Sequence, residues 1–467
     1  MTSTPPPLQP VVVGAGPAGI RAAQTLAAHG LRPTLIDEAA RGGGQIYRRA
    51  PAPFQRPPRA LYGAKAARAT ALHDTLDALQ TRIDYRPDSL VWNAQGGWLD
   101  TLHGPTQTMR TVPYGQLIVA SGATDRVLPI PGWTLPGVYT LGGAQVALKF
   151  QGCSIGRNVV LMGTGPLLYL VACEYARAGA KVTAVLDSAR FADHLAAVPA
   201  MLAQPATLAR GAYHMGWLRA HGVPMHTGVR PVRVLGNARV RGVVWRAGTQ
   251  EHTLACDAIG LGYALRPETQ LADLLGCRFA WDPMHRAHLP EHDAAGRTST
   301  PGVYLAGDGA AILGADAAEW AGERAALALL ADHGVSTDMA RARTLERQLR
   351  QLHGFRQGLE RAFPFPADWA SHASDALVLC RCENVRVGAL RACARDAGVD
   401  EMNRLKALTR VGMGRCQGRM CAVAAAEILA QASGKSVDQV GRLRGQAPVK
   451  PIPIHAQTRH GAAPGAA

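Results

Sequence analysis

The 467-residue chain contains the same pattern twice: an apolar strand, a glycine-rich turn, a helix, and a second strand that ends in aspartate. The separation between first glycine and aspartate is almost equal in the two copies, Gly14 to Asp37 and Gly163 to Asp187. Such a unit places helices against a parallel sheet. Its repetition predicts an α/β protein with two dinucleotide-type domains rather than one accidental glycine loop.

The first turn reads Gly14-Ala-Gly16-Pro-Ala-Gly19, the glycine spacing of a dinucleotide-binding fingerprint. The first glycine permits a tight turn, the second lets the backbone approach a pyrophosphate, and the third allows close helix–strand packing. The helix N-terminus then faces the phosphates, and Asp37 is placed for a ribose hydroxyl. The predicted contacts at this turn are Gly14, Gly16, Pro17, Ala18, Gly19, Asp37 and the adjacent Glu38.

The second turn, Gly163-Thr-Gly165-Pro-Leu-Leu168, departs from the fingerprint because leucine replaces the third glycine. That side chain keeps helix and strand farther apart than in a standard nucleotide-binding half. Asp187 would suit an unphosphorylated ribose. The sequence leaves open whether Gly163 and Gly165 hold NAD, another adenine nucleotide or nothing, the half then being a retained scaffold.

Four cysteines near the C-terminus form the pairs Cys380-x-Cys382 and Cys416-x4-Cys421. Glycines before Cys421 leave backbone N–H groups free to approach sulfur, and the alanine-rich stretch after it predicts a helix N-terminus, which favours thiolate. Four such thiolates can hold a [2Fe–2S] cluster. Structural zinc, whose paired ligands usually have about two to four residues between them, and unliganded thiols remain alternatives from spacing alone, although Cys-x-Cys is tighter than that zinc spacing.

The cysteine region resembles a known domain type. Segments 379–383, 406–410 and 412–421 are similar to the bacterioferritin-associated-ferredoxin-like (BFD-like) [2Fe–2S] domain. The variant is the one fused to the large flavin subunit of opine, hydroxyproline and proline dehydrogenases and of hydrogen cyanide synthase. This resemblance implies one [2Fe–2S] cluster with ligands Cys380, Cys382, Cys416 and Cys421.

Three earlier segments extend the resemblance over almost the whole chain. Residues 41–48 resemble the family segment that runs beside the flavin-side nucleotide. Residues 117–124 are similar to the return strand of two-dinucleotide-domain flavoproteins, although Ser121 stands where threonine is usual. Residues 302–308 resemble the late flavin motif, whose aspartate bonds the ribityl or pyrophosphate region. The implied cofactor contacts are Gly44, Gln45, Ser121, Gly122, Gly307 and Asp308.

The resemblance implies a glutathione-reductase-like fold in which an inserted domain splits the FAD-binding domain and a helical BFD-like [2Fe–2S] domain follows. Residues after Gly445 are expected to form an extended Pro-rich arm, and residues 457–467 to be disordered. The expected divisions are an FAD-binding domain at 1–125 and 266–335, an NAD(P)-like nucleotide domain at 126–265, a helical linker at 336–372, the BFD-like domain at 373–440, and the arm and tail at 441–467.

The implied function is that of an electron-relay subunit in a hetero-oligomeric, FAD-dependent amine or amino-acid dehydrogenase acting on CH–NH donors. A separate amino-acid-oxidase-like flavoprotein subunit takes hydride from the substrate, and a small [2Fe–2S] ferredoxin-like subunit is a second candidate partner. No catalytic residue is expected in this chain. The suggested substrates are D-hydroxyproline or another cyclic imino acid, then an opine, then glycine.

Three alternatives remain. One is a self-sufficient NAD(P)H-dependent flavin reductase, and another is a non-enzymatic redox-sensing scaffold. ATP or ADP could replace FAD at the first turn, because motifs at the adenine end do not report the flavin ring. A dithiol reductase of the thioredoxin type is disfavoured, since the early and middle cysteines lie singly.

The formal net charge of +16 does not indicate nucleic-acid binding, because the arginines are dispersed without a basic block. The N-terminus lacks the features of a signal peptide, and no run of about eighteen uncharged apolar residues predicts a membrane span. An odd count of nine cysteines fits a reducing compartment, so a cytoplasmic location is expected. His285, His288 and His292 lie in a polar stretch that is expected to be solvated surface rather than a metal site.

Overall fold

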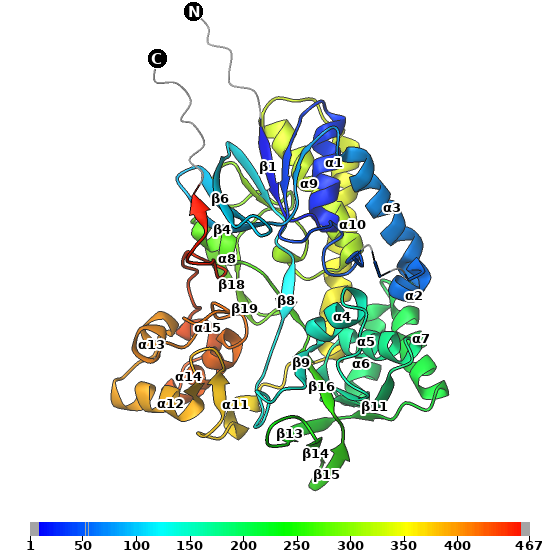
Figure 1. Cartoon of the computed structure of the whole chain (residues 1–467), viewed down its shortest axis with the longest axis vertical. Coiled ribbons are helices and arrows are strands. Elements are labelled where there is room, and N and C mark those ends of the chain that lie inside the picture. The colour runs from blue at the N-terminus through cyan, green and yellow to red at the C-terminus, as the bar shows by residue number, and fades with distance from the viewer. Residues whose placement is uncertain (1–8, 52, 55, 459–467) are drawn as a thin grey trace, which may run out of the picture.

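The structure, a computed structural model, describes residues 9–51, 53–54 and 56–458. Two parallel β-sheets, each with helices against it, form the upper and lower halves of the molecule (Figure 1). A group of C-terminal helices lies beside the lower half. The sequence predicted two such halves and a helical C-terminal region.

The upper sheet has five strands, and all neighbouring strands are parallel. The strand at one edge, Val303–Leu305, follows the lower half in sequence, so segments far apart in the chain build one sheet. Its strands in spatial order are β20 (Val303–Leu305), β7 (Gln116–Val119), β1 (Pro10–Val13), β2 (Thr34–Ile36) and β3 (Asp84–Arg86). Three helices share one apolar core with it: α1 (Pro17–Ala28), α3 (Ala66–Leu79) and α9 (Ala315–Asp332).

Helices α1 and α9 pack at close range because small residues line their contact. A Cβ atom on Gly322 would lie 2.0 Å from the carbonyl oxygen of Ala18, which no side chain could tolerate. Gly307, at φ +72°, meets the same alanine, since its Cβ would lie 2.8 Å from the Cβ of Ala18. These glycines therefore bring the late segment of the chain against the first glycine-rich turn.

An antiparallel group of strands flanks the upper sheet, and a two-stranded ribbon marks the crossing to the lower half. The antiparallel group comprises β4 (Ser89–Gln95), β5 (Trp98–His103) and β6 (Thr108–Pro113). The ribbon pairs β8 (Ala123–Asp125) with β17 (Leu265–Pro267) where the chain leaves and re-enters the upper half. Smaller elements of this half are α2 (Pro58–Tyr62), α8 (Gln270–Leu274), β18 (Phe279–Asp282) and β19 (Ala287–Pro290), with the 3-10 turns η1 (Gly63–Lys65) and η2 (Gly307–Gly309).

The lower half repeats the parallel arrangement. Its strands in spatial order are β12 (Met225–Thr227), β11 (Lys181–Asp187), β10 (Asn158–Thr164), β16 (Ala258–Tyr263) and β9 (Val138–Thr140). Its helices are α4 (Leu141–Lys149), α5 (Pro166–Arg177), α6 (Phe191–Met201) and α7 (Pro205–Ala220). An antiparallel sheet extends from it: β13 (Val229–Leu235), β14 (Gly242–Ala247) and β15 (Gln250–Ala255).

A long helix, α10 (Met339–Ala362), leads to the C-terminal helices, which share an apolar core with the lower half. Two indole N–H groups cross this boundary: Trp133 donates to the carbonyl of Val378 at 2.7 Å, and Trp369 to that of Pro129 at 2.9 Å. The cysteine region is thus packed onto the nucleotide-type domains. Its elements are α11 (Trp369–His372), β21 (Val378–Cys380), β22 (Val385–Arg386), α12 (Val387–Asp396), α13 (Met402–Thr409), α14 (Ala422–Ser433) and α15 (Val437–Val440).

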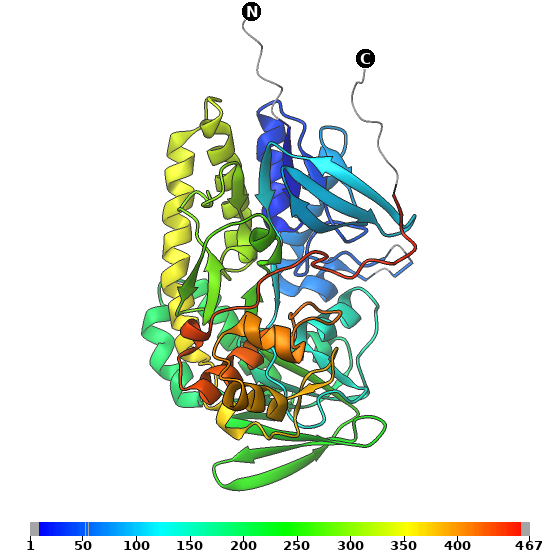
Figure 2. The same ribbon diagram turned by 90° about the vertical axis from the view of Figure 1, so that its left-hand side faces the viewer.

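The C-terminal arm lies on the upper half of its own chain (Figure 2). Val449 is buried, and its N–H donates to the carbonyl of Trp92 at 3.0 Å. At its end β23 (Gln457–Thr458) pairs in parallel with β6. The expectation of disorder from 457 is therefore wrong for these two residues, because the free edge of β6 supplies a hydrogen-bonding partner. Residues 459–467 lie outside the described residues.

Across the described parts of the chain, no helix combines the length and the apolar character needed to cross a membrane.

Candidate cofactor cavity and cysteine loop

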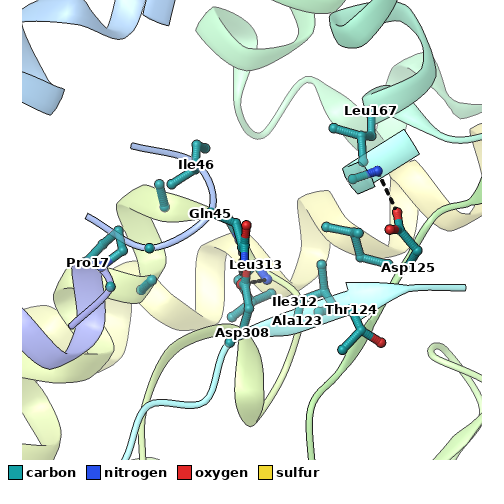
Figure 3. Close-up of a pocket in the computed structure, with 18 of the residues that line it drawn as sticks. Pro17, Gln45, Ile46, Ala123, Thr124, Asp125, Leu167, Asp308, Ile312 and Leu313 are labelled. Carbon is teal, nitrogen blue, oxygen red and sulfur yellow. Dashed lines mark hydrogen bonds between the residues drawn. The ribbon is translucent and has the colours of Figure 1, made fainter. Parts of the chain in front are cut away.

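A cavity of about 1020 Å³ lies where the carboxyl ends of the upper strands face the lower half. Pro17 and Gln45 line it on one side and Leu167 on the other (Figure 3). Of the residues predicted for the first nucleotide site, those that line the cavity are Gly14, Gly16, Pro17, Ala18, Asp37, Glu38, Gly44, Gln45, Ser121, Gly122 and Asp308. Gly19 and Gly307 instead serve helix packing, and Gly163 and Gly165 lie outside the cavity lining.

The three glycines of the first turn meet different surroundings. Gly14 has φ +103°, and a Cβ there would lie 2.3 Å from the carbonyl oxygen of Ala120. A Cβ on Gly19 would lie 1.7 Å from the oxygen of Gly14, so that glycine allows helix–strand contact. On Gly16 the nearest atom would be the Cα of Gly44 at 3.7 Å. Packing therefore demands the first and third glycines, whereas the second borders open cavity.

Asp37 fixes the first turn through its carboxylate. One oxygen accepts the N–H of Ala39 at 2.7 Å, and the other accepts the N–H of Ala15. Burial raises the pKa of Asp37, and these two N–H donors oppose that rise. A carboxylate offers about four acceptor positions, so a ribose hydroxyl can still bind beside the backbone donors.

Asp308 organises the opposite side of the cavity. Its Oδ1 accepts the N–H groups of Leu313 and Gly314, each at 3.0 Å, in the turn that precedes α9. Burial raises the pKa of Asp308. Among the described residues no donor reaches its Oδ2, which leaves one oxygen for a hydroxyl group in the cavity.

The arm closes another wall of the cavity. Val449 and Lys450 both line it, and the Lys450 ammonium pairs with the carboxylate of Glu38, next to the predicted ribose position. The carbonyl oxygen of Val449 also accepts from Nη1 of Arg419 at 2.6 Å. The sequence did not predict these contacts, because nothing in the spacing of the arm identifies the surface on which it lies.

We expect deletion of 446–467 to destabilise the chain by about 2–3 kcal/mol, from the lost burial of Val449 and the lost hydrogen bonds. Bound FAD should fall with it, because one wall of the cavity is removed. Melting temperature and FAD per chain measure the two effects. Ile454→Ala, at a fully exposed arm residue, is the matched control. Unchanged stability and FAD content in the deletion would show that the arm is a loose tail.

The second glycine turn leads to a carboxylate that is already engaged. Asp187 is completely buried and accepts the hydroxyl of Tyr169 at 2.7 Å and the N–H of Ala189 at 2.9 Å. Nε2 of His194 lies 3.4 Å from the same carboxylate. The ring of Phe363 packs against the imidazole of His194, with 4.8 Å between the two ring centroids. Leu168 is fully buried in the lower core. The position expected to bind a ribose is thus covered by protein.

We therefore expect the isolated chain to bind NADH with a Kd weaker than roughly 1 mM, a binding free energy of less than about 4 kcal/mol. Mixing NADH with the anaerobic, FAD-loaded chain should leave the flavin absorption unchanged over seconds. Rapid bleaching would contradict this and would favour the self-sufficient reductase. Tyr169→Phe removes the hydrogen bond from the Tyr169 hydroxyl to Asp187. This variant tests whether that hydrogen bond prevents NADH from binding.

The four paired cysteines influence one another. The Cys421 thiol is the largest cause that lowers the pKa of Cys380 to about 6 and that of Cys416 to about 5. Burial and the neighbouring Cys416 raise the pKa of Cys382. Cys421 stands at the N-cap of α14, as the alanine-rich stretch predicted.

Backbone donors surround these sulfurs. The N–H groups of Gly412 and Glu383 lower the pKa of Cys380, and those of Gly418 and Met420 lower the pKa of Cys416. Such donors are the ones that stabilise thiolates and the negative charge of an iron–sulfur cluster. Within the described residues no group of three or more His, Cys, Asp or Glu side chains is arranged to hold a metal ion, so the ligand role of the four cysteines stays a prediction.

His285, His288 and His292 were expected to be solvated, and the structure contradicts this for His285. His285 is buried, not solvated, with Nδ1 at 3.1 Å from Asp282 Oδ1 and Nε2 at 3.3 Å from the N–H of Ile312. It supports the turn that contains the partners of Asp308. His288 is half-buried and His292 is exposed. The polar sequence around His285 concealed its role, because its partner at 312 is distant in the chain.

Comparison with known proteins identifies the class. Residues 8–336 match the pyridine nucleotide-disulphide oxidoreductase family, and residues 379–459 match the sarcosine oxidase A3 domain. The second match crosses the boundary expected at 440. The fold, the cavity and these matches define a flavoprotein oxidoreductase, and FAD is the cofactor that the family supports.

Two relatives are similar over nearly their full length. An opine oxidase subunit from Agrobacterium tumefaciens is 35% identical, with 95% of this chain and 90% of the relative covered. The hydrogen cyanide synthase subunit HcnB of Pseudomonas protegens is 35% identical, with 96% and 97% covered. The chain belongs to the pyridine nucleotide-disulphide oxidoreductase family and, more narrowly, to the family that contains this opine oxidase subunit and HcnB.

A solved structure has the same fold at low sequence identity. L-proline dehydrogenase from P. horikoshii superposes with a TM-score of 0.72 at 19% identity, covering 97% of this chain and 79% of that one. Thioredoxin reductase from T. acidophilum aligns with 70% of this chain and 98% of its own, at a TM-score of 0.51 and 20% identity. The fold similarity thus extends through the C-terminal region in the first comparison.

Proposed function

We propose that FAD lies in the cavity, with its pyrophosphate at the first glycine turn and with Asp37 and Asp308 at hydroxyl groups. Support comes from the convergence of these residues, which lie far apart in sequence, on one cavity. Bound FAD would accept two electrons at a time and could pass them singly to a one-electron acceptor. The residues of this chain orient the cofactor and exclude water from it.

The second part of the proposal is a [2Fe–2S] cluster on Cys380, Cys382, Cys416 and Cys421. The chemistry of the donor set fits, because the four thiols shift one another's pKa and backbone N–H groups act on three of them. A bound cluster would supply one-electron transfer. The nine cysteines are all free, which agrees with a reducing, cytoplasmic location.

The function that these sites support best is electron relay within a multi-subunit amine or amino-acid dehydrogenase. The observation that carries it is the cavity lining: Arg419 and Met420, directly before Cys421, border the same cavity as Gly16 and Asp308. The two proposed redox sites are therefore adjacent in one chain. The names of the relatives, which are subunits, agree with a partner that oxidises the substrate.

Co-expression with an amino-acid-oxidase-like flavoprotein tests the proposal, with and without a small ferredoxin-like protein. The complex should oxidise an amine or amino acid, with D-hydroxyproline or another cyclic imino acid assayed first, an opine second and glycine third. The isolated chain should be a poor catalyst with all three. Equal turnover by the isolated chain, or no complex with such a partner, would refute the relay function.

A further inference from the structure

The loop between Cys416 and Cys421 is attached to the cofactor cavity by one arginine. Arg419 donates to both carboxylate oxygens of Glu268, from Nε at 2.7 Å and from Nη2 at 3.2 Å. Its Nη1 reaches the carbonyl oxygen of Cys416 at 3.4 Å and that of Val449 at 2.6 Å. The side chains of Arg419 and Glu268 are only 15% and 11% exposed, so solvent screens this ion pair weakly.

The glutamate at the other end of this pair is held by segment 117–124, which resembles the return strand of two-dinucleotide-domain flavoproteins. The N–H of Glu268 donates to the carbonyl of Gly122 at 2.9 Å, and the hydroxyl of Ser121 donates to the carbonyl of Glu268 at 2.6 Å. Both Ser121 and Glu268 line the cavity. One continuous set of contacts therefore joins the cavity wall to the loop that contains two of the paired cysteines.

A second arginine, Arg266 of β17, contacts the same loop. Nη2 of Arg266 donates to the carbonyl oxygen of Arg419 at 3.3 Å, and its Nε is inaccessible and has no partner within the described chain. Burial lowers the pKa of Arg266, with Glu268 opposing that shift. In turn, Arg419 and Arg266 lower the pKa of Glu268 against the effect of its burial.

The charges at this place do not cancel. Two guanidinium groups meet one carboxylate, which leaves about one unit of positive charge beside Cys416 and Cys421. Neighbouring ion pairs on this domain are balanced one to one: Arg410 with Glu383, Arg286 with Glu427 and Arg442 with Asp273. Two guanidinium groups and one carboxylate therefore meet on the side of the cysteine loop that faces the cavity.

We propose that Arg266, Glu268 and Arg419 form a positioning junction that holds the cysteine loop on the flavin cavity and raises the reduction potential of the cluster. The proposal rests on the [2Fe–2S] cluster assigned above. Reduction adds one electron, donated from the flavin side, and makes the cluster more negative by one charge. Nearby positive charge stabilises that reduced form, and weak screening in a buried site enlarges the effect.

Two substitutions of opposite charge effect test the junction. Arg266→Gln removes a positive charge and should lower the potential, so that at a fixed potential the reduced-to-oxidised ratio falls about tenfold, equal to about 59 mV for a one-electron couple. Arg266→Lys should restore most of the wild-type value. Glu268→Gln removes the negative charge and should shift the potential upward. Loosening of the structure alone would not shift the reduction potentials of Arg266→Gln and Glu268→Gln in opposite directions.

The measurement is a redox titration of the full-length chain in its complex, followed by electron paramagnetic resonance, with iron, sulfide and FAD counted in every variant. Arg278→Gln, at an exposed ion pair with Glu291, is the matched control and should leave the potential unchanged. A cluster-loaded protein whose potential is unchanged, or moves the same way in Arg266→Gln and Glu268→Gln, overturns the proposal. A wild-type protein without iron and sulfide would instead refute the cluster assignment itself.

Discussion

Gly16→Ala should release FAD from an otherwise folded protein. The added methyl group would meet no atom closer than 3.7 Å, so the fold tolerates it, but it would project where the backbone approaches the proposed pyrophosphate. Forcing extra volume into a packed contact costs about 1–3 kcal/mol, which corresponds to roughly 5- to 150-fold weaker FAD binding. FAD per chain after gel filtration, and a titration of the apoprotein with FAD, would measure the loss.

Two further glycine variants serve as comparisons for Gly16→Ala. Gly354→Ala on α10 would meet no neighbour within 4 Å and should bind FAD like wild type. Gly19→Ala should instead destabilise the whole upper half, since its Cβ would lie 1.7 Å from a carbonyl oxygen. Full FAD content in Gly16→Ala would exclude a pyrophosphate at this turn. Release of ATP or ADP in place of FAD from the denatured wild type would correct the identity of the ligand.

The second large effect is expected for Cys421→Ser. Cys421 is buried and lowers the pKa of both Cys380 and Cys416, so it lies within the proposed ligand group. A hydroxyl group is a far poorer ligand for iron than a thiolate. Anaerobically purified protein should fall from about two irons and two sulfides per chain to almost none, with loss of the visible cluster absorption.

Cys393→Ser provides the comparison within the same domain. Cys393 is half-buried on α12 and is not one of the four paired cysteines, so the iron and sulfide contents of this variant should match wild type. FAD content should be similar in the two variants, because neither Cys421 nor Cys393 lines the cavity. One zinc per wild-type chain, with no visible absorption, would decide for a structural zinc site.

The sequence by itself determined the backbone requirements of the fold. The two strand–turn–helix copies predicted two parallel sheets, since alternating strands and helices bury a sheet in only a few ways. The glycine spacing predicted a tight turn and close helix packing, which Gly14 and Gly19 provide. The alanine-rich stretch after Cys421 predicted α14. These signals are local, so a single stretch of sequence contains all of the information.

Tertiary structure decided which predicted groups are available to a ligand. Asp187 fits the fingerprint in sequence, yet the hydroxyl of Tyr169 occupies its carboxylate and the ring of Phe363 packs against Tyr169. Burial and hydrogen-bond partners depend on residues far apart in the chain, and neither periodicity nor motif spacing reports them. The same reason applies to His285, which a distant backbone N–H holds in the interior.

The link between the two proposed redox sites was likewise set only by packing. In sequence, Arg419 is one arginine among many, and Glu268 belongs to no recognised motif. The fold brings them within 2.7 Å because the C-terminal helices share a core with the lower half and the arm lies on the upper half. Sequence thus specified the two sites separately, whereas their adjacency arose from long-range burial of apolar surface, which acts between whole elements.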